Sequence, residues 1–281
     1  MTRLRIKHTT SFSYVANVQA SYNEARMRPD MSDRQFLLSS QMVITPLSSQ
    51  NQFTDYWGTR VTSIEVLTPH QDLSIVAESL VEINPRPTVV DGLEWGDLKE
   101  APSASAELTE LLSLTPLTKP PKDVIRSAHK IAAASETPDH AAREICEWVN
   151  SEMSYVPGVT AVHSSAAEAW KDRQGVCQDI SHITLGALRS VGIPARYVSG
   201  YLHPVADAEI GQVVEGESHA WVEWWSGGFR GFDPTNNREV GDRHAVVGRG
   251  RDYKDVPPLR GVYDGPPTSN HSVSVELSLE Y

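Results

Sequence analysis

A helix that begins at a cysteine is predicted by the stretch Gly175-Val-Cys-Gln-Asp-Ile-Ser-His-Ile-Thr-Leu-Gly-Ala-Leu-Arg-Ser-Val-Gly-Ile-Pro194. After Cys177 the apolar residues recur with helical spacing, at Ile180, Ile183, Ala187, Leu188 and Val191. Gly192 followed by Ile193-Pro194 is typical of a helix end. A thiol at a helix N-terminus lies in the positive field of the helix dipole, which favours the thiolate. Cys177 is therefore a candidate nucleophile.

Two downstream segments supply a base and a carboxylate. His219 lies in Ser218-His-Ala-Trp-Val-Glu223, within a predicted strand, and Asp233 ends the next strand-like run, 229–233. The Ser226-Gly-Gly228 turn signal lies between the two runs. If the strands pair through this turn, one imidazole nitrogen can face Asp233 while the other faces Cys177, as a Cys-His-Asp site requires.

The order of these motifs resembles the bacterial transglutaminase-like superfamily. The resemblance rests on Gly175-Val-Cys177-Gln-Asp179, Ser218-His219-Ala-Trp221-Val-Glu and Gly231-Phe-Asp233-Pro-Thr-Asn236, in that order. It implies a papain-like core in which Cys177 is the nucleophile, His219 the general base and acid, and Asp233 the residue that orients His219. Family members are described as cysteine proteases or as protein-glutamine acyltransferases. The chain shows no calcium-loop pattern, so we expect no metal and no cofactor.

The predicted fold class is α+β, with the cysteine helix packed on an antiparallel sheet that carries His219 and Asp233. Apolar and polar residues alternate over 4–14 and again over 73–83, so the first 88 residues read as mostly antiparallel sheet. This half resembles the β-rich amino-terminal domain of the same family. The predicted division is a β-rich domain at 1–100, a linker at 101–117 and the catalytic core at 118–281. Six prolines between 84 and 121 indicate the connector, and the alternating residues 273–281 predict a last strand.

Composition excludes several function classes. The chain of 281 residues has 25 Lys and Arg against 36 Asp and Glu, a net charge of -11, which disfavours nucleic acid and anionic membranes as partners. Its two cysteines, Cys146 and Cys177, cannot form a disulfide framework, and Cys146 lies on an apolar helix face as an expected core thiol. The first residues lack the apolar run of a secretory signal, so we expect a cytoplasmic protein without a membrane span.

Other polar and aromatic residues near the motifs have structural interpretations. We expect Asp179 to cap free N–H groups of the helix and His182 to be a hydrogen-bonded core residue. Tyr155 and His163 are the candidates for the second oxyanion donor, after the backbone N–H of Cys177. The segment 248–252, Gly-Arg-Gly-Arg-Asp, is predicted to be a mobile loop. The tryptophans are expected in the core, at positions Trp170, Trp221, Trp224 and Trp225.

The predicted reaction is hydrolysis of a peptide or carboxamide bond through a thioester on Cys177, with a peptide or protein amide as substrate. Hydrolysis is preferred because transamidation needs an amine site that excludes water. Two alternatives stay open, a protein-glutamine transamidase and a catalytically idle binding or assembly module. A zinc site built from Cys177, His182 and His219 is a further alternative, but zinc needs about four ligands. The oligomeric state and the exact substrate stay open.

Overall fold

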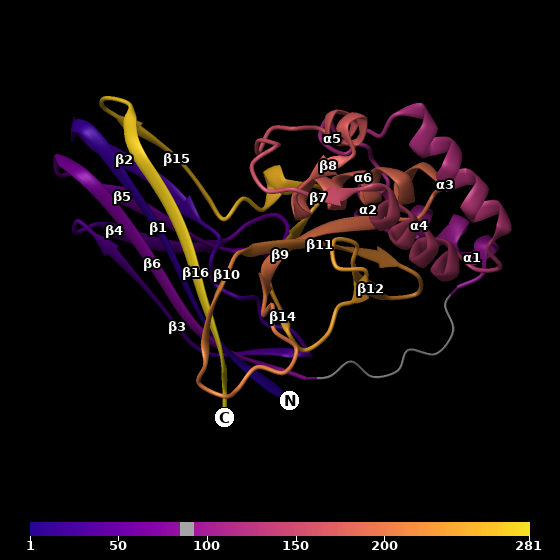
Figure 1. Cartoon of the computed structure of the whole chain (residues 1–281), viewed down its shortest axis with the longest axis horizontal. Helices are drawn as coiled ribbons and strands as arrows, with labels where there is room; N and C mark the ends of the chain where they lie inside the picture. The colour runs from indigo at the N-terminus through magenta and orange to yellow at the C-terminus, as the bar shows by residue number, and fades with distance from the viewer. Residues whose placement is uncertain (85–92) are drawn as a thin grey trace.

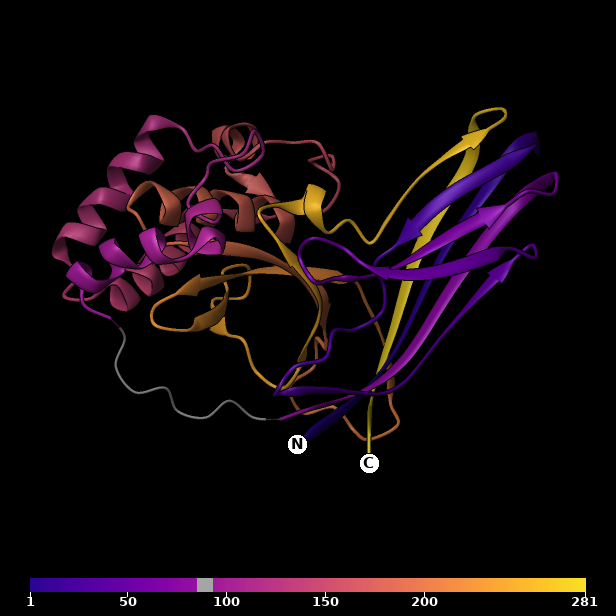
Figure 2. The same cartoon turned by 180° about the vertical axis from the view of Figure 1, so that it is seen from behind.

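A β-sandwich lies beside an α+β core in the computed structural model, which describes residues 1–84 and 93–281 (Figure 1). Helices α3 (Lys122–Ala134) and α4 (Pro138–Glu152) lie on the side of the core away from the sandwich, and both chain termini lie where the two parts meet (Figures 1 and 2). The α+β fold class, with the cysteine helix on the sheet that carries His219 and Asp233, is confirmed.

The longest strands of the sandwich form a five-stranded sheet, in the order β10 (Val213–Gly216), β16 (Thr268–Glu280), β1 (Thr2–Val18), β6 (His70–Ile83) and β3 (Gln35–Thr45). The even positions of β1 face inward, as the alternation predicts, and Leu4, Ile6 and Tyr14 are buried. The second sheet has the order β15 (Leu259–Asp264), β2 (Ala20–Ala25), β5 (Arg60–Val66) and β4 (Ser49–Thr54).

The end of the chain departs from the predicted division at 118–281. Strands β15 and β16 leave the core and pair with β2 and β1 of the sandwich, with Leu4 opposite Leu279. The alternation of 273–281 correctly predicts a strand, but period two says only that one face is buried, and not which sheet the strand joins. The sandwich is therefore built from both ends of the chain.

The core contains a sheet in the order β13 (Arg238–Glu239), β12 (Phe229–Asp233), β11 (Ser218–Trp225), β9 (Ala195–Leu202) and β14 (His244–Gly250). A short parallel pair, β7 (Ser154–Tyr155) and β8 (Gln174–Gly175), precedes the cysteine helix α6 (Cys177–Ser190). The other helical elements are α1 (Trp95–Glu100), η1 (Ala101–Ala104), α2 (Ala106–Glu110), α3 (Lys122–Ala134), α4 (Pro138–Glu152), α5 (Ala166–Asp172) and η2 (Tyr253–Asp255).

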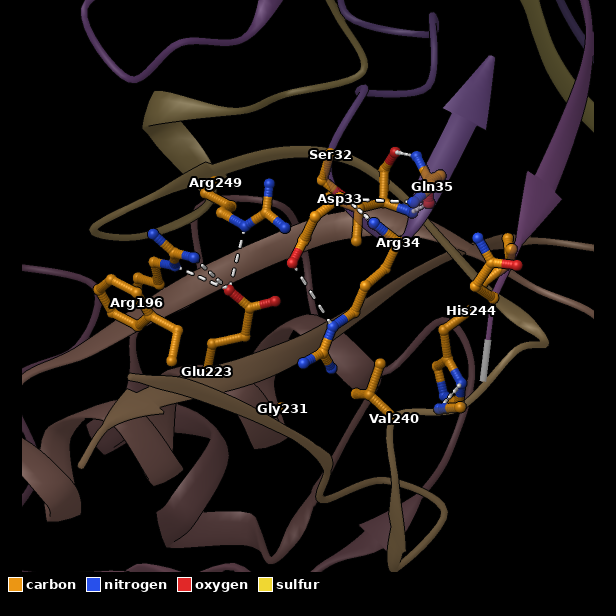
Figure 3. A pocket seen from close by; sticks show the side chains of 15 residues that line it. Ser32, Asp33, Arg34, Gln35, Arg196, Glu223, Gly231, Val240, His244 and Arg249 are labelled. Atoms are coloured by element: carbon orange, nitrogen blue, oxygen red, sulfur yellow. Dashed lines mark hydrogen bonds and ion pairs between the residues drawn. The ribbon is translucent and has the colours of Figure 1, made fainter. Parts of the chain in front are cut away.

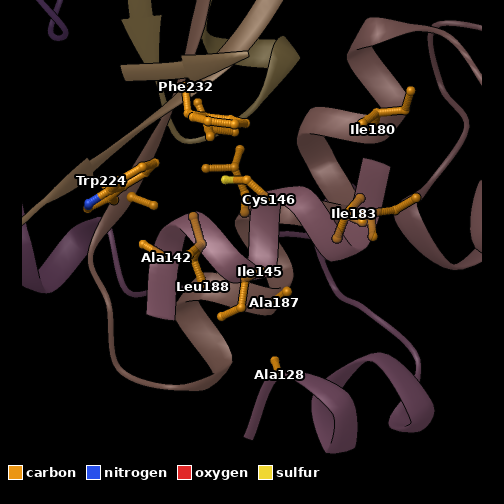
Figure 4. Close-up of a cluster of buried hydrophobic side chains, with 14 of the residues drawn as sticks. Ala128, Ala142, Ile145, Cys146, Ile180, Ile183, Ala187, Leu188, Trp224 and Phe232 are labelled. Carbon is orange, nitrogen blue, oxygen red and sulfur yellow. The ribbon is translucent and has the colours of Figure 1, made fainter. Parts of the chain in front are cut away.

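Helix α6 is the centre of the core because α3, α4, α5 and β11 all pack on it. Its side chains are buried on nearly every face, so the surrounding elements fix its position. Gly186 permits the closest approach, since a Cβ there would lie 2.1 Å from the carbonyl oxygen of Thr118. Cys146 of α4 is fully buried among Ala142, Ile145 and Trp224, as predicted for a core thiol (Figure 4).

The predicted linker 101–117 is packed on the core. Leu108, Leu111 and Leu117 are buried, and the backbone N–H of Ala195 donates to the carbonyl of Leu111. Pro85 and Pro87 of the predicted connector lie within residues 85–92, outside the described residues. The segment 101–117 is packed, and not a free linker, because its leucines are buried. Prolines indicate turns, but they do not show whether those turns pack against the core.

Candidate active site

Cys177 is the first residue of α6, as predicted, and its side chain is partly exposed. The carboxylate of Asp179 folds back to accept the backbone N–H of Val176 at 2.9 Å and the hydroxyl of Thr160 at 2.6 Å. Burial raises the pKa of Asp179, although these hydrogen bonds oppose the rise. The predicted capping role of Asp179 is confirmed, and this cap holds the loop before α5 beside the cysteine.

His219 and Asp233 meet because β11 and β12 form the predicted hairpin. Nε2 of His219 lies 2.8 Å from Oδ2 of Asp233. The other carboxylate oxygen accepts the backbone N–H groups of Thr235 and Asn236, at 3.1 and 3.2 Å. Burial acts to raise the pKa of Asp233, but its hydrogen bonds to His219 and His244 and the His219 charge outweigh burial and hold it well below the usual range.

The imidazole of His219 is held in its protonated form. Burial lowers its pKa, but hydrogen bonds to Asp233 and Cys177, together with the negative charges of both groups, outweigh burial and raise the pKa to about 10. Because Nε2 is on Asp233, Nδ1 is the nitrogen left for the Cys177 sulfur. The structure therefore brings together all three predicted site residues, in an arrangement that suits a thiolate–imidazolium pair.

Two further residues hold the carboxylate, and sequence reasoning assigned neither. Nδ2 of Asn236 donates to Oδ2 of Asp233 at 2.7 Å, and Nε2 of His244 lies 3.4 Å from the same oxygen. Burial lowers the pKa of His244, and its Nδ1 accepts the N–H of Gly241, so its Nε2–H donates to Asp233. Asn236 ends the third motif and could have been found there, whereas His244 lies in no motif.

Of the other residues considered in the sequence analysis, Tyr155 lines the cleft, whereas His182 and His163 do not. His182 is fully buried and accepts the backbone N–H of Tyr253, and burial with nearby Arg189 lowers its pKa to about 3, so its core role is confirmed. Tyr155 lies beside the cysteine, and its hydroxyl donates to Glu217 at 3.2 Å. Burial and the negative charges of Glu217 and Cys177 raise the pKa of Tyr155 to about 12. His163 is exposed and does not line the cleft.

The predicted core tryptophans are largely confirmed. Trp170, Trp221 and Trp224 are buried, whereas Trp225 is only partly buried against the core. The ring of Trp221 packs edge-on against His244, with ring centroids 5.3 Å apart. This tryptophan thereby helps to fix one of the groups that surround Asp233.

The candidate cleft has a volume of about 340 Å³ and contains Cys177 and His219. Tyr155, Tyr197 and Tyr253 contribute aromatic walls, so the thiol faces a largely apolar space. A pocket of that size accommodates part of a peptide or a small acyl group.

A separate pocket of about 260 Å³ lies between the segment that leads into β3 and the core sheet (Figure 3). Its charges are paired within the protein, because Glu223 binds Arg196 at 2.7 Å and Arg249 at 3.0 Å, and Arg249 also binds Asp30. The predicted mobile loop 248–252 is wrong, since 248–250 belong to β14 and these ion pairs fix Arg249. The thiol does not line this pocket, so we do not assign the chemistry to it.

Within residues 1–84 and 93–281, no group of three or more His, Cys, Asp or Glu side chains is placed to hold a metal ion. Helices in the same described ranges are all too short or too polar to cross a membrane. His182 points to Tyr253 and Tyr197, so the structure gives the alternative zinc site no support.

Family models match both parts of the chain. Residues 125–234 match the transglutaminase-like superfamily, and residues 4–82 match the bacterial transglutaminase-like N-terminal region. The chain belongs to the transglutaminase-like superfamily. An uncharacterized protein of Mycobacterium leprae is 39% identical, covering 99% of this chain and 99% of the relative.

Two further similarities concern the fold and the core. The crystal structure of a "putative cysteine protease" from Cytophaga hutchinsonii superposes with a TM-score of 0.78 at 18% identity, over 99% of this chain and 98% of the other. The transglutaminase-like protein therefore shares its whole two-part architecture with that structure. A protein-glutamine gamma-glutamyltransferase of Pseudomonas aeruginosa is 34% identical over 122 residues, which are 39% of this chain and 18% of that protein.

Proposed function

We propose that this transglutaminase-like protein catalyses acyl transfer from a peptide or protein amide through a thioester on Cys177, with water as the usual acceptor. The observation that carries the proposal is the His219 imidazole, which is fixed by Asp233 at 2.8 Å and lines the same cleft as the Cys177 thiol at the start of α6. This arrangement supplies a nucleophile, a proton donor and a group that orients the donor. We also propose a cytoplasmic location for the protein.

The first half of the reaction forms the thioester. The Cys177 thiolate attacks the amide carbonyl carbon, and the carbonyl electrons move onto oxygen. The backbone N–H of Cys177 at the helix start is the first donor to that oxyanion. Tyr155 is the candidate second donor, provided that its hydroxyl turns from Glu217 to the oxyanion. When the carbonyl re-forms, the C–N bond breaks, and His219 Nδ1–H gives its proton to the departing amine or ammonia.

The second half releases the acyl group. His219, now neutral, takes a proton from water while the water oxygen attacks the thioester carbonyl. Collapse of the second tetrahedral intermediate breaks the C–S bond and restores the thiolate and the imidazolium, so the products are a carboxylic acid and an amine. Asp233 stays ionised throughout and keeps Nδ1 directed at the sulfur.

Transamidation is the second candidate function, and the similarity of the core to the Pseudomonas glutamyltransferase favours it. A primary amine would then replace water in the second half. The tyrosines that line the cleft supply part of the apolar surface that such a reaction needs to exclude water. The third candidate is an idle binding module. Such a module would not need the five hydrogen bonds that converge on Asp233.

The test is a library of peptides with glutamine or amide bonds, incubated with and without a fluorescent primary amine. We expect release of ammonia or cleaved peptide in both conditions, with loss of all product in Cys177→Ala. Cys146→Ala is the matched control, because it removes the other thiol without touching the cleft. Incorporation of the amine in preference to hydrolysis would replace hydrolase by transamidase, and no turnover of any peptide would support the idle module.

A further inference from the structure

A third pocket, of about 460 Å³, continues from the cleft towards the sandwich. The two spaces share lining residues from both parts of the chain, Val162, Ser218, Tyr253, Pro258 and Val273. Figure 2 shows the segment between η2 and β15, which contains Pro258, crossing from the core to the sandwich. The cleft beside Cys177 thus extends onto the inner face of the long sheet, and we call this extension the sandwich groove.

The groove exists because one sheet packs against two partners. At one end of β1, Leu4 and Ile6 pack with Ala245 and Val247 of the core sheet. Towards the other end, Tyr14 packs with Ile64 and other residues of the second sandwich sheet. His8, Thr10 and Phe12 lie between these two clusters along β1, and all three line the groove.

The residues of β1 between the two clusters are less apolar than the rest of its inward-facing side. His8 and Thr10 occupy inward positions where β1 otherwise carries apolar side chains. Nδ1 of His8 lies 2.9 Å from the Tyr201 hydroxyl, and Nε2 lies 3.2 Å from Oγ1 of Thr10. Burial lowers the pKa of His8 to about 4, so the floor of the groove is uncharged near pH 7.

Aromatic rings form the walls of the sandwich groove. Phe12 and His271 stack with centroids 4.6 Å apart, and Tyr14 and Tyr263 lie 4.9 Å apart. Arg260 also lines the groove, but its guanidinium is paired with Glu24 at 2.7 Å. Such a lining favours a flat, uncharged side chain, because rings stack on rings and a buried charge would find no free counter-ion here.

Acidic side chains line a further space that adjoins the cleft at His219. Glu215 and Glu217 line it together with Asn236, and Glu217 also lines the cleft itself. Free amines are mostly cations near neutral pH, so acidic side chains favour their approach to the site and their departure from it. If the amine portion of the substrate binds in this acidic space, the acyl portion extends from Cys177 into the sandwich groove.

We infer that the sandwich groove binds an aromatic side chain on the acyl portion of the peptide substrate, so that the amino-terminal sandwich determines specificity. This inference rests on the proposed function, because it needs an acyl donor at Cys177. It assigns the sandwich a role in substrate selection that its distance in sequence from the cysteine does not suggest.

The test uses peptidyl chloromethyl ketones, which alkylate a cysteine after binding as acyl donors do. The probes are acetyl-Phe-Gly-Gly, acetyl-Gly-Phe-Gly and acetyl-Gly-Gly-Gly chloromethyl ketones, with iodoacetamide as a reagent too small to occupy the groove. We expect at least one phenylalanine probe to react with Cys177 about tenfold faster than the glycine probe, from burial of its ring. Rates are compared as kinact/KI, with the labelled residue identified by peptide mapping.

Val273→Lys places a charge where the cleft joins the groove, at a side chain that is 51% exposed. We expect it to remove the tenfold preference for phenylalanine. Val43→Lys, on the outer face of β3 and 55% exposed, is the matched control and should keep the preference. Equal rates for all three peptides, or a preference that survives Val273→Lys, would overturn the inference while the proposed function stands. Failure of every reagent, iodoacetamide included, to alkylate Cys177 would overturn both.

Discussion

Replacement of Asp233 by asparagine tests how the imidazolium is held. The pKa of His219 is raised from 6.5 to about 10, which corresponds to roughly 5 kcal/mol in favour of the charged ring. Asp233 and the thiolate share that preference, and an equal division gives Asp233 about 2 kcal/mol, or on the order of 10² in the equilibrium between charged and neutral ring. The amide N–H of asparagine would also face the donors on Asn236 and His244, which disturbs the orientation of His219.

The expected result is a fall of about 10² to 10⁴ in acyl transfer per folded molecule. Alkylation of Cys177 by iodoacetamide should also slow at pH 7. At pH 7 the wild-type imidazole keeps its proton, because the pKa of His219 is raised to about 10, and the variant should be alkylated more slowly at this pH because its imidazolium is less stable. Both rates are measured by quenching samples and mapping the labelled peptide.

Asp139→Asn is the matched control, because that carboxylate also holds a buried ring nitrogen, Nε1 of Trp224 at 2.9 Å, but lies away from the cleft. It should lower the melting temperature without changing the alkylation profile. If Asp233→Asn lowers the melting temperature alone and leaves both rates unchanged, Asp233 only shapes the turn before Pro234, and the reasoning is refuted.

Three other predictions follow from burial and from the residues of the site. Brief iodoacetamide treatment at pH 7 should label Cys177 and spare Cys146, whose pKa is raised by complete burial; equal labelling on a peptide map contradicts this. Chelation with EDTA should leave turnover unchanged, and activity that disappears with EDTA and returns with calcium or zinc would reveal a missed metal. Burial lowers the pKa of His182 to about 3, so between pH 6.5 and about pH 3 the unfolded chain takes up a proton there that the folded chain does not. The free energy of unfolding should therefore fall by roughly 1.4 kcal/mol per pH unit over this range. His182→Gln should therefore lose less stability than the wild type between pH 7 and 4.5 in urea unfolding, unlike the exposed control His271→Gln.

The sequence was sufficient for the elements that depend on local patterns. The cysteine helix follows from the spacing of Ile180, Ile183 and Ala187, and the hairpin that joins His219 to Asp233 follows from one glycine-rich turn. Hairpins and helices are made by residues near each other in the chain, so their signals are compact. The meeting of the three predicted site residues could be anticipated for this reason.

Pairings between distant segments could not be predicted. The register of β16 against β1 joins Leu279 to Leu4, and no local pattern specifies a partner at the other end of the chain. His244 reaches Asp233 only because β14 lies beside β9, which places one more imidazole against the carboxylate. The sandwich groove has the same origin, since its residues come from β1, β15, β16 and the core.

The central claim is that Cys177 carries the acyl group, and intact-protein mass spectrometry tests it most directly. The full chain is mixed with p-nitrophenyl acetate at pH 7, quenched in acid within seconds, weighed and digested for peptide mapping. The account predicts one added acetyl group, on Cys177, that disappears with time and is absent from Cys177→Ala. An acetyl group on another residue, or an unmodified Cys177 while nitrophenol is released, would contradict it.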